Sequence, residues 1–486
     1  VDKVDEDKLV EEAIIKMLAQ LDPHSTYSDA EEVKKMNEPL QGNFEGIGVQ
    51  FQMIEDTLLV VQPVSNGPSE KIGILAGDRI IAVNDSAIAG VKMSTEEIMK
   101  RLRGPKGSKV NLKIVRRGVQ DPLVFTVKRD KIPILSLDAS YMIQPKTGYI
   151  RINRFGATTA EEFKKAMKEL QKQGMKDMIL DLQGNGGGYL NAAIDLANEF
   201  LGQKELIVYT EGRTAKRSDF YAKGNGEFRN GRLIVLVDEY TASASEIVSG
   251  AVQDWDRGII VGRRSFGKGL VQRPIDLPDG SMIRLTIARY YTPAGRCIQK
   301  PYDSSTDYNK DLIERFNHGE LMNADSIHFP DSLKVQTKKL GRTVYGGGGI
   351  MPDYFVPIDT TLYTDYHRNL VAKGAVIKFT MKFIEGHRKE LANKYKKFES
   401  FNEKFIIDDD MLATLREMGE KEGVKFNEEQ YQKSLPLIKT QLKALIARDL
   451  WDMNEYFRVM NTTNESVQKA LEILNSEEYQ KKLRAN

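Results

Sequence analysis

The sequence predicts a multidomain α/β protein with a βα core, an embedded β-rich module and helical regions at both ends. Three observations support this fold class. Strands and helices alternate from residue 132 within a core that extends to 356, short strands with turn signals fill residues 44–131, and residues 1–43 and 357–486 have helical patterns. A chain of 486 residues is long enough for roughly two to four such parts, each with a core of its own.

The composition excludes several classes of function. Lys and Arg number 71 and Asp and Glu number 69, so no net field favours nucleic acid as a partner. No apolar stretch reaches the roughly 18 residues of a transmembrane helix. The start, VDKVDEDKL, does not have the pattern of a signal peptide, which is compatible with a trimmed, exported precursor. The single Cys297 excludes an internal disulfide and leaves the compartment open.

The first two regions of the chain have distinct patterns. In residues 1–43, a second helix is expected after Ser28, and DKLVEEAIIKMLAQL places four apolar residues near one helical face: Leu9, Ile14, Met17 and Leu21. In residues 44–131, GIGVQFQMIEDTLLVVQPV, SKVNLKIVRRG and LVFTVKRD are typical of strands, and STEEIMKRLRG is typical of a helix. The second region is therefore expected to be a compact domain.

The core alternates between strand and helix patterns. TGYIRINRF, KDMILDL, RLIVLV and RGIIVG have the apolar, β-branched composition of buried strands. TAEEFKKAMKELQKQG, LNAAIDLANEFL and ASEIVSGAVQDW lie between them and have helical periodicity. This order predicts a largely buried sheet covered by helices.

The segment GRRSFGKG, residues 262–269, has the glycine and lysine spacing of a phosphate-binding P-loop. Gly269, however, stands where a P-loop needs a Ser or Thr for magnesium. A P-loop lysine also begins a helix, whereas Lys268 is followed by Pro274, a PDG turn signal and the β-rich MIRLTIARYY. The sequence therefore favours a β-hairpin after Lys268 over a nucleotide site.

Ser243 is the candidate nucleophile. It lies in a turn of small residues between the strand LIVLV and the helix ASEIVSGAVQDW. Ser243 and Glu246 also form the S-x-x-E pattern of a capping box, so a purely structural role as a helix cap is the alternative. A serine at such a turn is exposed, and the helix amides behind it can hold a developing oxyanion.

Lys268 can supply the base that Ser243 needs. The two residues follow consecutive strands, so their turns are expected to meet at one edge of the sheet. Burial lowers the pKa of a lysine, and a neutral amine can take the proton of a serine without a histidine. Gln272 is placed four residues later to orient the amine by a hydrogen bond.

The segment DLQGNGGG, residues 181–188, follows a strand with three consecutive glycines. A flexible loop is the structural explanation. Consecutive glycine amides before a helix can also point toward one anion, and the G-x-G-x-x-G spacing of a dinucleotide site is not met. We expect this loop to supply a second oxyanion donor near Gly187 and Gly188, beside Ser243.

The histidines are few, and a long stretch of the chain has none. Residues 25–317, which hold the best strand and glycine-loop signals, contain none of them, so a metal site there would lack the commonest ligand and a local Ser-His pair is excluded. No metal or cofactor is expected. The five histidines are His24, His318, His328, His367 and His387.

These segments together resemble the carboxyl-terminal processing peptidases, also called tail-specific proteases. TASASEIVSGAVQDWDRGIIVGRRSFGKGLVQ is similar to the family's signature block, and DLQGNGGG to its D-L-R-x-N-P-G-G loop. LDPHSTY, MIRLTIARYYTPAGRCIQ and GGGGIMPD resemble further family segments, so the similarity covers residues 10–356. The resemblance implies a Ser-Lys serine endopeptidase with an embedded PDZ domain that cleaves near unstructured protein C-termini.

The resemblance also implies roles for individual residues. Ser243 would be the nucleophile, Lys268 the general base and Gln272 the residue that orients the lysine. The oxyanion hole would comprise the amide of Ala244 and one amide from Gly187 or Gly188.

The glycine loop departs from the family pattern. Gln183 stands in place of an arginine, Gly184 in place of the variable residue and Gly186 in place of a proline. A loop without that proline is more flexible, so which glycine amide donates is left open.

GIGVQF resembles the carboxylate-binding loop of a PDZ domain. The amides from Gly46 to Gly48 would bind the terminal carboxylate of a substrate. Apolar neighbours would line the pocket for its last side chain, although a place in the ordinary core of the domain is the alternative for them: Ile47, Val49, Ile98 and Leu102.

The resemblance further implies a bacterial periplasmic or cell-envelope location. The expected partners are protein or peptide substrates with free C-termini and no nucleic acid, while an adaptor protein and a homodimer are left open. Residues 357–486 lie outside the family motifs and suit a dimerisation element, a docking surface or a wall that limits access to Ser243.

Two other functions compete with a protease. A catalytically idle PDZ scaffold would only bind C-terminal tails, but Ser243, Lys268 and Gln272 are all present. A nucleotide-dependent enzyme is disfavoured by Gly269 and by the expected hairpin.

Overall fold

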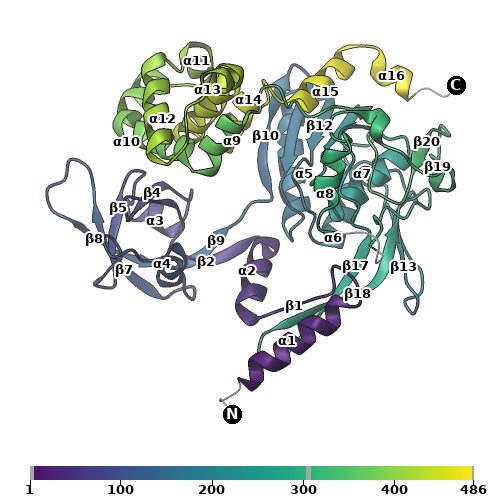
Figure 1. Cartoon of the computed structure of the whole chain (residues 1–486), viewed down its shortest axis with the longest axis horizontal. Helices are drawn as coiled ribbons and strands as arrows, with labels where there is room; N and C mark the ends of the chain where they lie inside the picture. The colour runs from purple at the N-terminus through teal and green to yellow at the C-terminus, as the bar shows by residue number, and fades with distance from the viewer. Residues whose placement is uncertain (1–4, 303–307, 484–486) are drawn as a thin grey trace. The chain divides into compact units, whose positions relative to one another are not determined.

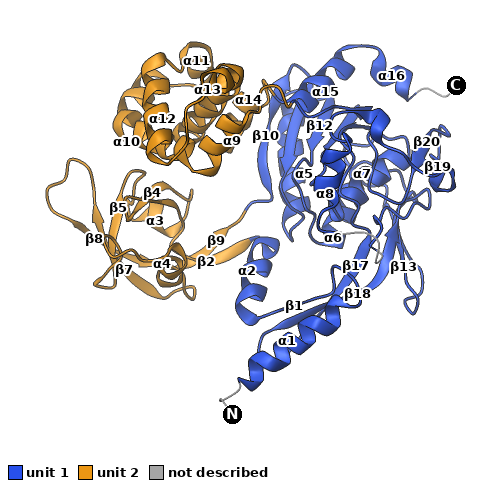
Figure 2. Ribbon diagram, viewed as in Figure 1, with its two compact units in different colours: residues 1–42, 135–359, 464–486 blue, residues 43–134, 360–463 orange. Residues whose placement is uncertain are grey.

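The computed structural model describes residues 5–302 and 308–483, so the outermost residues of the predicted N-terminal segment and C-terminal region lie outside the described part. The chain forms two compact units (Figure 2). Unit 1 comprises residues 1–42, 135–359 and 464–486, and unit 2 comprises residues 43–134 and 360–463. The region predicted as one C-terminal helical region is therefore divided between the two units, and the domain boundaries given above stay predictions.

Unit 1 is built on a six-stranded sheet in the order β10-β11-β12-β15-β16-β21. Figure 1 labels two of these strands, β10 and β12. The first pair is antiparallel and all later neighbours are parallel, which confirms the α/β prediction. Every residue of β12 and β15 is buried, as expected for strands covered on both faces. The strands are β10 (Leu137–Gln144), β11 (Thr147–Ile152), β12 (Asp177–Asp181), β15 (Leu233–Val237), β16 (Ile259–Gly262) and β21 (Tyr354–Phe355).

Helices cover this sheet and complete its core. The helices α5 (Thr159–Lys172), α6 (Leu190–Ala197) and α7 (Ala244–Asp254) connect its strands, as the alternating pattern predicts. The tail helix α15 (Glu465–Asn475) contacts β12, β15 and β16. In α16 (Glu478–Lys482), the hydroxyl of Tyr479 accepts a hydrogen bond of 2.9 Å from the amide of Leu233. The end of the chain therefore belongs to the core of unit 1.

A second sheet in unit 1 contains the hairpin predicted after Lys268. β17 (Leu270–Asp276) pairs antiparallel with β18 (Met282–Tyr291). The short β1 (Thr26–Ser28), which the sequence did not predict, also pairs with β18. The remaining elements are α1 (Glu6–Ala19), α2 (Ala30–Gln41), β13 (Leu206–Glu211), β14 (Ser218–Tyr221), α8 (Asp311–Asn317), β19 (Lys334–Gln336), β20 (Thr343–Tyr345) and short 3-10 turns at Ala324–Ser326 and Asp331–Leu333.

The β-rich part of unit 2 has a sheet in the order β3-β4-β5-β7-β8, with β6 beside β5 and a separate β2-β9 pair. Its core is aliphatic and includes Leu58, Ile80 and Leu112. The elements are β2 (Asn43–Gly46), β3 (Val49–Ile54), β4 (Thr57–Pro63), α3 (Pro68–Lys71), β5 (Arg79–Val83), β6 (Ser86–Ala87), α4 (Thr95–Leu102), β7 (Lys109–Val115), β8 (Leu123–Lys128) and β9 (Asp130–Pro133).

The helical part of unit 2 has a separate core rich in aromatic side chains, among them Phe379, Phe401 and Trp451. Glu385 of its second helix forms an ion pair of 3.1 Å with Arg79 of β5, and its carbonyl oxygen accepts from Arg117 at 2.9 Å. The helices are α9 (Asp365–Ala372), α10 (Ala375–Lys394), α11 (Phe398–Lys404), α12 (Asp409–Lys421), α13 (Glu428–Leu450) and α14 (Met453–Met460).

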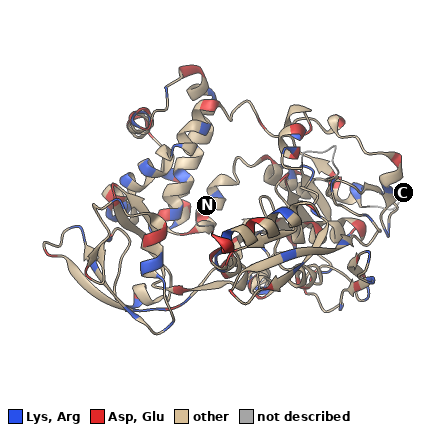
Figure 3. Ribbon diagram, turned by 60° about the horizontal axis from the view of Figure 1, so that its bottom comes forward, with Lys and Arg blue, Asp and Glu red and all other residues tan. Residues whose placement is uncertain are grey.

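Charge and hydropathy agree with the composition. Figure 3 shows Lys and Arg interspersed with Asp and Glu in both units, and their totals in the sequence nearly balance. Among the helices of the described residues, none combines the length and the apolar character needed to cross a membrane.

Candidate active site

Three loops meet at the carboxyl edge of the parallel strands in unit 1. The glycine loop follows β12, Ser243 follows β15 and Lys268 follows β16. Neighbouring parallel strands bring such loops together at one edge of a sheet. All three loops line one cavity of about 740 Å³, which includes the residues predicted for catalysis: Gly187, Gly188, Ser243, Ala244, Lys268 and Gln272.

Ser243 occupies the residue position immediately before α7, as the sequence predicts, in a strained conformation. Its φ of 58° and ψ of −116° lie in a region that residues with a Cβ rarely adopt. Such strain costs about 1–3 kcal/mol and persists only where the surroundings hold the backbone in place. The sharp turn from β15 into α7 places Ser243 in the wall of the cavity.

The carboxylate of Glu246 stabilises this turn, and it accepts more hydrogen bonds than the predicted capping box requires. One carboxylate oxygen accepts from the amides of Ser243 at 2.8 Å and Lys268 at 2.9 Å. The other accepts from the Ser265 hydroxyl at 2.5 Å and the Gly267 amide at 2.7 Å. Burial raises the pKa of Glu246 to about 7, and the four donors oppose that rise by favouring the carboxylate. The side chain thus joins the loops of both candidate catalytic residues.

The environment of Lys268 favours its neutral form. Burial lowers the pKa of the Lys268 amine, and the nearby cation Arg284 lowers it further. Arg284 lines the same cavity from β18, and its buried Nε has no hydrogen-bond partner among the described residues. Within the described part of the chain, no direct hydrogen bond joins Lys268 to the hydroxyl of Ser243.

A histidine from outside the core reaches this region. The side chain of Gln272 donates to the carbonyl oxygen of His24, and no hydrogen bond between Gln272 and Lys268 is recorded among the described residues. The His24 Nε2 lies 2.7 Å from the hydroxyl of Tyr308. Burial lowers the pKa of His24 to about 4, and Lys268 acts in the same direction. The orienting role predicted for Gln272 therefore stays a prediction.

The sequence argument that excluded a local Ser-His pair did not anticipate this arrangement. It considered only residues 25–317, whereas His24 arrives with the strand β1, which pairs with β18. Asp22 fixes the same segment by accepting from the hydroxyl of Thr286 at 2.9 Å. The signal in the sequence was the segment LDPHSTY, whose resemblance to a family block had no structural explanation.

The glycine loop lies directly against Ser243. A Cβ added to Gly187 would lie 2.8 Å from the Cβ of Ser243 and 2.9 Å from the amide nitrogen of Ala244. A Cβ added to Gly188 would lie 2.1 Å from the carbonyl oxygen of Phe155. Their φ values of 98° and 147° also favour glycine. Only glycine allows the loop to approach this closely.

The two glycine amides differ in their hydrogen bonds. The amide of Gly187 donates to the side-chain oxygen of Asn185 at 2.8 Å. Among the described residues, no acceptor is recorded for the amides of Gly188 and Ala244. Asn185 is fully buried, and its carbonyl oxygen accepts from the hydroxyl of Ser245 at 3.0 Å, which fixes the loop to α7.

In unit 2, the predicted carboxylate loop and its apolar neighbours have different surroundings. The carbonyl oxygens of Ile47 and Gly48 accept hydrogen bonds within the domain, whereas no acceptor is recorded for their amides among the described residues. Three of the four predicted pocket residues are core residues with little exposure: Ile47 at 3%, Ile98 at 0% and Leu102 at 4%. Val49 is only partly buried and packs against that core.

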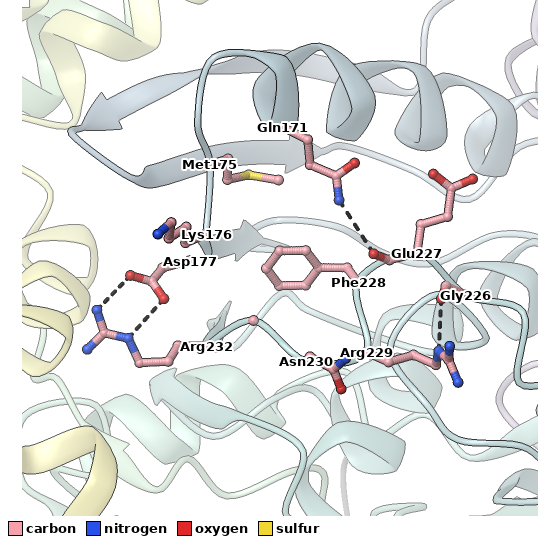
Figure 4. A pocket seen from close by; sticks show the side chains of 11 residues that line it. Gln171, Met175, Lys176, Asp177, Gly226, Glu227, Phe228, Arg229, Asn230 and Arg232 are labelled. Atoms are coloured by element: carbon pink, nitrogen blue, oxygen red, sulfur yellow. Dashed lines mark hydrogen bonds and ion pairs between the residues drawn. The ribbon is translucent and has the colours of Figure 1, made fainter.

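A second cavity in unit 1, of about 470 Å³, lies between the end of α5 and the segment that precedes β15 (Figure 4). Three of its charged side chains pair within the lining: Asp177, Arg229 and Arg232. Arg232 binds the carboxylate of Asp177 at 2.6 and 2.9 Å, and Arg229 donates to the carbonyl oxygen of Gly226. None of the residues predicted for catalysis lines it.

Three family models match separate parts of the chain. Peptidase family S41 matches residues 146–306, a PDZ domain matches residues 46–131, and a family of unknown function (DUF8443) matches residues 366–452. The first range contains Ser243 and Lys268. The third lies entirely within the helical part of unit 2.

Named proteins are similar to more than half of the chain. A carboxy-terminal-processing protease of Bartonella bacilliformis is 40% identical over 302 residues, which are 61% of this chain and 68% of that protein. Carboxy-terminal processing protease CtpB of Bacillus subtilis is 36% identical, over 62% of each chain. A solved photosystem II D1 C-terminal processing protease is 28% identical with a TM-score of 0.39, covering 75% of this chain and 86% of that one. The chain belongs to peptidase family S41, among the carboxy-terminal-processing proteases.

Proposed function

We propose that the protein is a serine endopeptidase in which Ser243 is the nucleophile and Lys268 is the general base. One observation carries the proposal: a single cavity is lined by Ser243, Lys268, Gly188 and Ala244, and the amides of the last two have no acceptor recorded among the described residues. These are the groups that acyl transfer needs, namely a nucleophile, a base and donors for an oxyanion. The lowered pKa of Lys268 supports its role as the base.

The reaction proceeds in two halves. The neutral amine of Lys268 takes the hydroxyl proton of Ser243 as the serine oxygen attacks the peptide carbonyl carbon. The carbonyl π electrons move to the oxygen, whose negative charge is held by the amides of Ala244 and Gly188. When this intermediate collapses, the C–N bond breaks, and the leaving amine takes the proton from Lys268. An ester of Ser243 remains.

Water completes the cycle. Lys268 takes a proton from the attacking water molecule, and the oxyanion forms again at the same two amides. Collapse breaks the bond to the serine oxygen, which recovers its proton from Lys268. The products are a new C-terminal carboxylate and the free enzyme.

We also propose that the PDZ domain binds the C-terminal carboxylate of the substrate. The amides of Ile47 and Gly48 lack acceptors among the described residues, and this supports a carboxylate site in the loop. The burial of Ile98 and Leu102 favours their core role, so Val49 is the better candidate for contact with the ligand. A periplasmic or envelope location, an adaptor and a homodimer remain proposals that rest on the family resemblance.

Cleavage of an unstructured model protein with a free C-terminus tests the function. Wild type is expected to produce new C-termini, whereas Ser243→Ala and Lys268→Ala are each expected to be inactive while binding the same C-terminal peptide normally. Because the two residues act as a unit, the double variant should be no worse than either single variant. Tail binding without any cleavage by wild type would favour the idle-scaffold alternative, and cleavage at the wild-type rate by Ser243→Ala would show that another group performs the cleavage.

A further inference from the structure

We propose that Glu246 and Tyr290 are positioning residues that hold the backbone of the nucleophile to the backbone of the base. Each side chain bonds both Ser243 and Lys268, one at their amides and the other at their carbonyl oxygens. This inference rests on the proposed function, because it explains how two residues from different strands keep a reactive geometry.

Glu246 holds the amide side. Its side chain is fully buried, and one carboxylate oxygen accepts from the amides of Ser243 and Lys268. The other oxygen accepts from Ser265 and Gly267, which precede Lys268 in the same loop. Three of the four donors therefore belong to the loop of the base, although Glu246 lies on the helix of the nucleophile.

Tyr290 holds the carbonyl side. Its hydroxyl lies 3.0 Å from the carbonyl oxygen of Ser243 and also donates to that of Lys268. The ring is buried, with 2% of its surface exposed, in the core cluster of unit 1. The residue belongs to β18, so a third element of the fold fixes the same two residues.

Two other capping boxes among the described residues show that a helix cap alone does not need this arrangement. At α2, the Glu32 side chain accepts from the amide of Asp29, and at α4 the Glu97 side chain accepts from Ser94. Both glutamates are exposed and bond within their own turn. Glu246 is buried and also bonds the loop of Lys268, which follows another strand. Its side chain therefore links two loops in addition to capping α7.

The site needs the hydrogen bonds of Glu246 and Tyr290 for two reasons. Ser243 has a strained backbone that its surroundings must hold. No side-chain hydrogen bond between Ser243 and Lys268 is recorded within the described residues, so the separation of their reactive atoms depends on the backbone that carries them. A misplacement of about 1 Å in a catalytic group can reduce the rate roughly 100-fold.

The test compares kcat and KM of Glu246→Gln and Tyr290→Phe with wild type in the full chain. Glutamine keeps the shape but presents one oxygen and an NH₂ group to donors, so kcat should fall about 100-fold, as for a misplaced group. Phenylalanine removes one hydroxyl, and kcat should fall about tenfold. KM should change less than about twofold in both variants, because neither side chain is proposed to touch the substrate.

A matched control separates positioning from general stability. Asp254 lies on the same helix, is fully buried and pairs with Arg296 at 2.5 Å, but it does not contact either loop. Asp254→Asn should lower the melting temperature and leave kcat at wild-type level well below that temperature. The labelling rate of Ser243 by a fluorophosphonate should fall in Glu246→Gln and Tyr290→Phe but not in Asp254→Asn.

The pH dependence of kcat is a further test, because a purely structural role of Glu246 would not shift its acid limb. Lys268 faces the cation Arg284 from β18, the carboxylates of Glu246 and Asp22, and the neutral His24. Where Glu246 is ionised, above its pKa of about 7, Glu246→Gln removes a negative charge that favours the protonated amine, so the acid limb of kcat should shift to lower pH. Tyr290→Phe changes no charge and should leave the limb in place.

The outcomes distinguish this proposal from the proposed function. If Glu246→Gln and Tyr290→Phe both keep the wild-type kcat while Ser243→Ala is inactive, the positioning role of Glu246 and Tyr290 is refuted and the Ser-Lys mechanism stands. An equal loss of kcat in Asp254→Asn would also refute the positioning role, because the loss would then reflect general destabilisation of the fold. Activity of Ser243→Ala would overturn the mechanism itself. If Glu246→Gln does not fold, Tyr290→Phe alone decides the question.

Discussion

Gly187→Ala should reduce kcat about 100-fold or more. The added methyl group would lie 2.8 Å from both the Ala242 carbonyl oxygen and the Ser243 Cβ, and 2.9 Å from the Ala244 amide nitrogen. Two of these neighbours are backbone atoms, so no side-chain rotation relieves the contact. A φ of 98° adds about 1–3 kcal/mol of strain for a residue with a Cβ. The loop or the start of α7 must move.

That movement would separate the two amides proposed for the oxyanion. Loss of one oxyanion donor typically costs about 2.7–4 kcal/mol in the transition state, which corresponds to about 10²–10³ in kcat. KM should change less than about threefold, because the proposed tail site lies in unit 2. The assay is steady-state cleavage of an unstructured peptide, with circular dichroism and a melting curve to confirm folding.

Gly186→Ala is the matched control in the same loop. Apart from Gly186 itself and its two chain neighbours, no atom of the described residues lies within 4 Å of the position of its Cβ, so the alanine should leave kcat and KM near wild-type values. A wild-type kcat in Gly187→Ala would refute the argument that this loop serves the oxyanion. An equal loss in Gly186→Ala would show that the loop responds to any substitution and not to the contact with Ser243.

Three further predictions follow from the proposed chemistry. Activity should rise with pH as Lys268 loses its proton; because the cation Arg284 lowers the pKa of Lys268, Arg284→Gln should raise that pKa and shift the acid limb of a pH–rate profile to higher pH. Arg154 also lines the cavity but does not contribute to the pKa shift of Lys268, so Arg154→Gln should leave the acid limb unchanged. An equal shift of the acid limb in both variants would contradict the assignment of Lys268 as the base. A substrate with a free C-terminal carboxylate should be cut about tenfold or more efficiently than its amidated twin, because a charge-assisted hydrogen bond is worth about 1.5–3 kcal/mol; equal kcat/KM values would show that the PDZ domain does not read the substrate's end. A zinc chelator should leave peptide cleavage unchanged, since the proposed steps use only Ser243, Lys268 and backbone amides, and a loss that added zinc restores would count against them.

The parts of the site that local patterns determine could be predicted from the sequence. The small-residue turn before a helix predicts the position of Ser243, and the PDG turn predicts the hairpin after Lys268; the structure confirms both. The order of the strands predicts that their loops meet at one edge. These predictions succeed because periodicity, turn chemistry and chain connectivity are short-range properties.

The parts that depend on contacts between distant segments could not be predicted. The S-x-x-E pattern predicts Glu246 as a cap, but nothing local indicates that its carboxylate also accepts from the amide of Lys268. In the sequence, Tyr290 has the pattern of an ordinary strand residue. In the structure, its position in β18 places its hydroxyl between the loops of Ser243 and Lys268. His24 lies just before a three-residue strand that pairs with a strand about half the chain length away. Helical periodicity likewise did not indicate that α15 belongs to the core of unit 1.

Labelling of the full chain with a fluorophosphonate tests the central claim most directly, with the modified residue identified by peptide mass spectrometry. The account predicts a single adduct on Ser243 that increases with pH as Lys268 deprotonates, is lost in Ser243→Ala and is strongly slowed in folded Lys268→Ala. An adduct on another residue, or labelling of Lys268→Ala at the wild-type rate, would contradict the assignment of Ser243 and Lys268 as nucleophile and base.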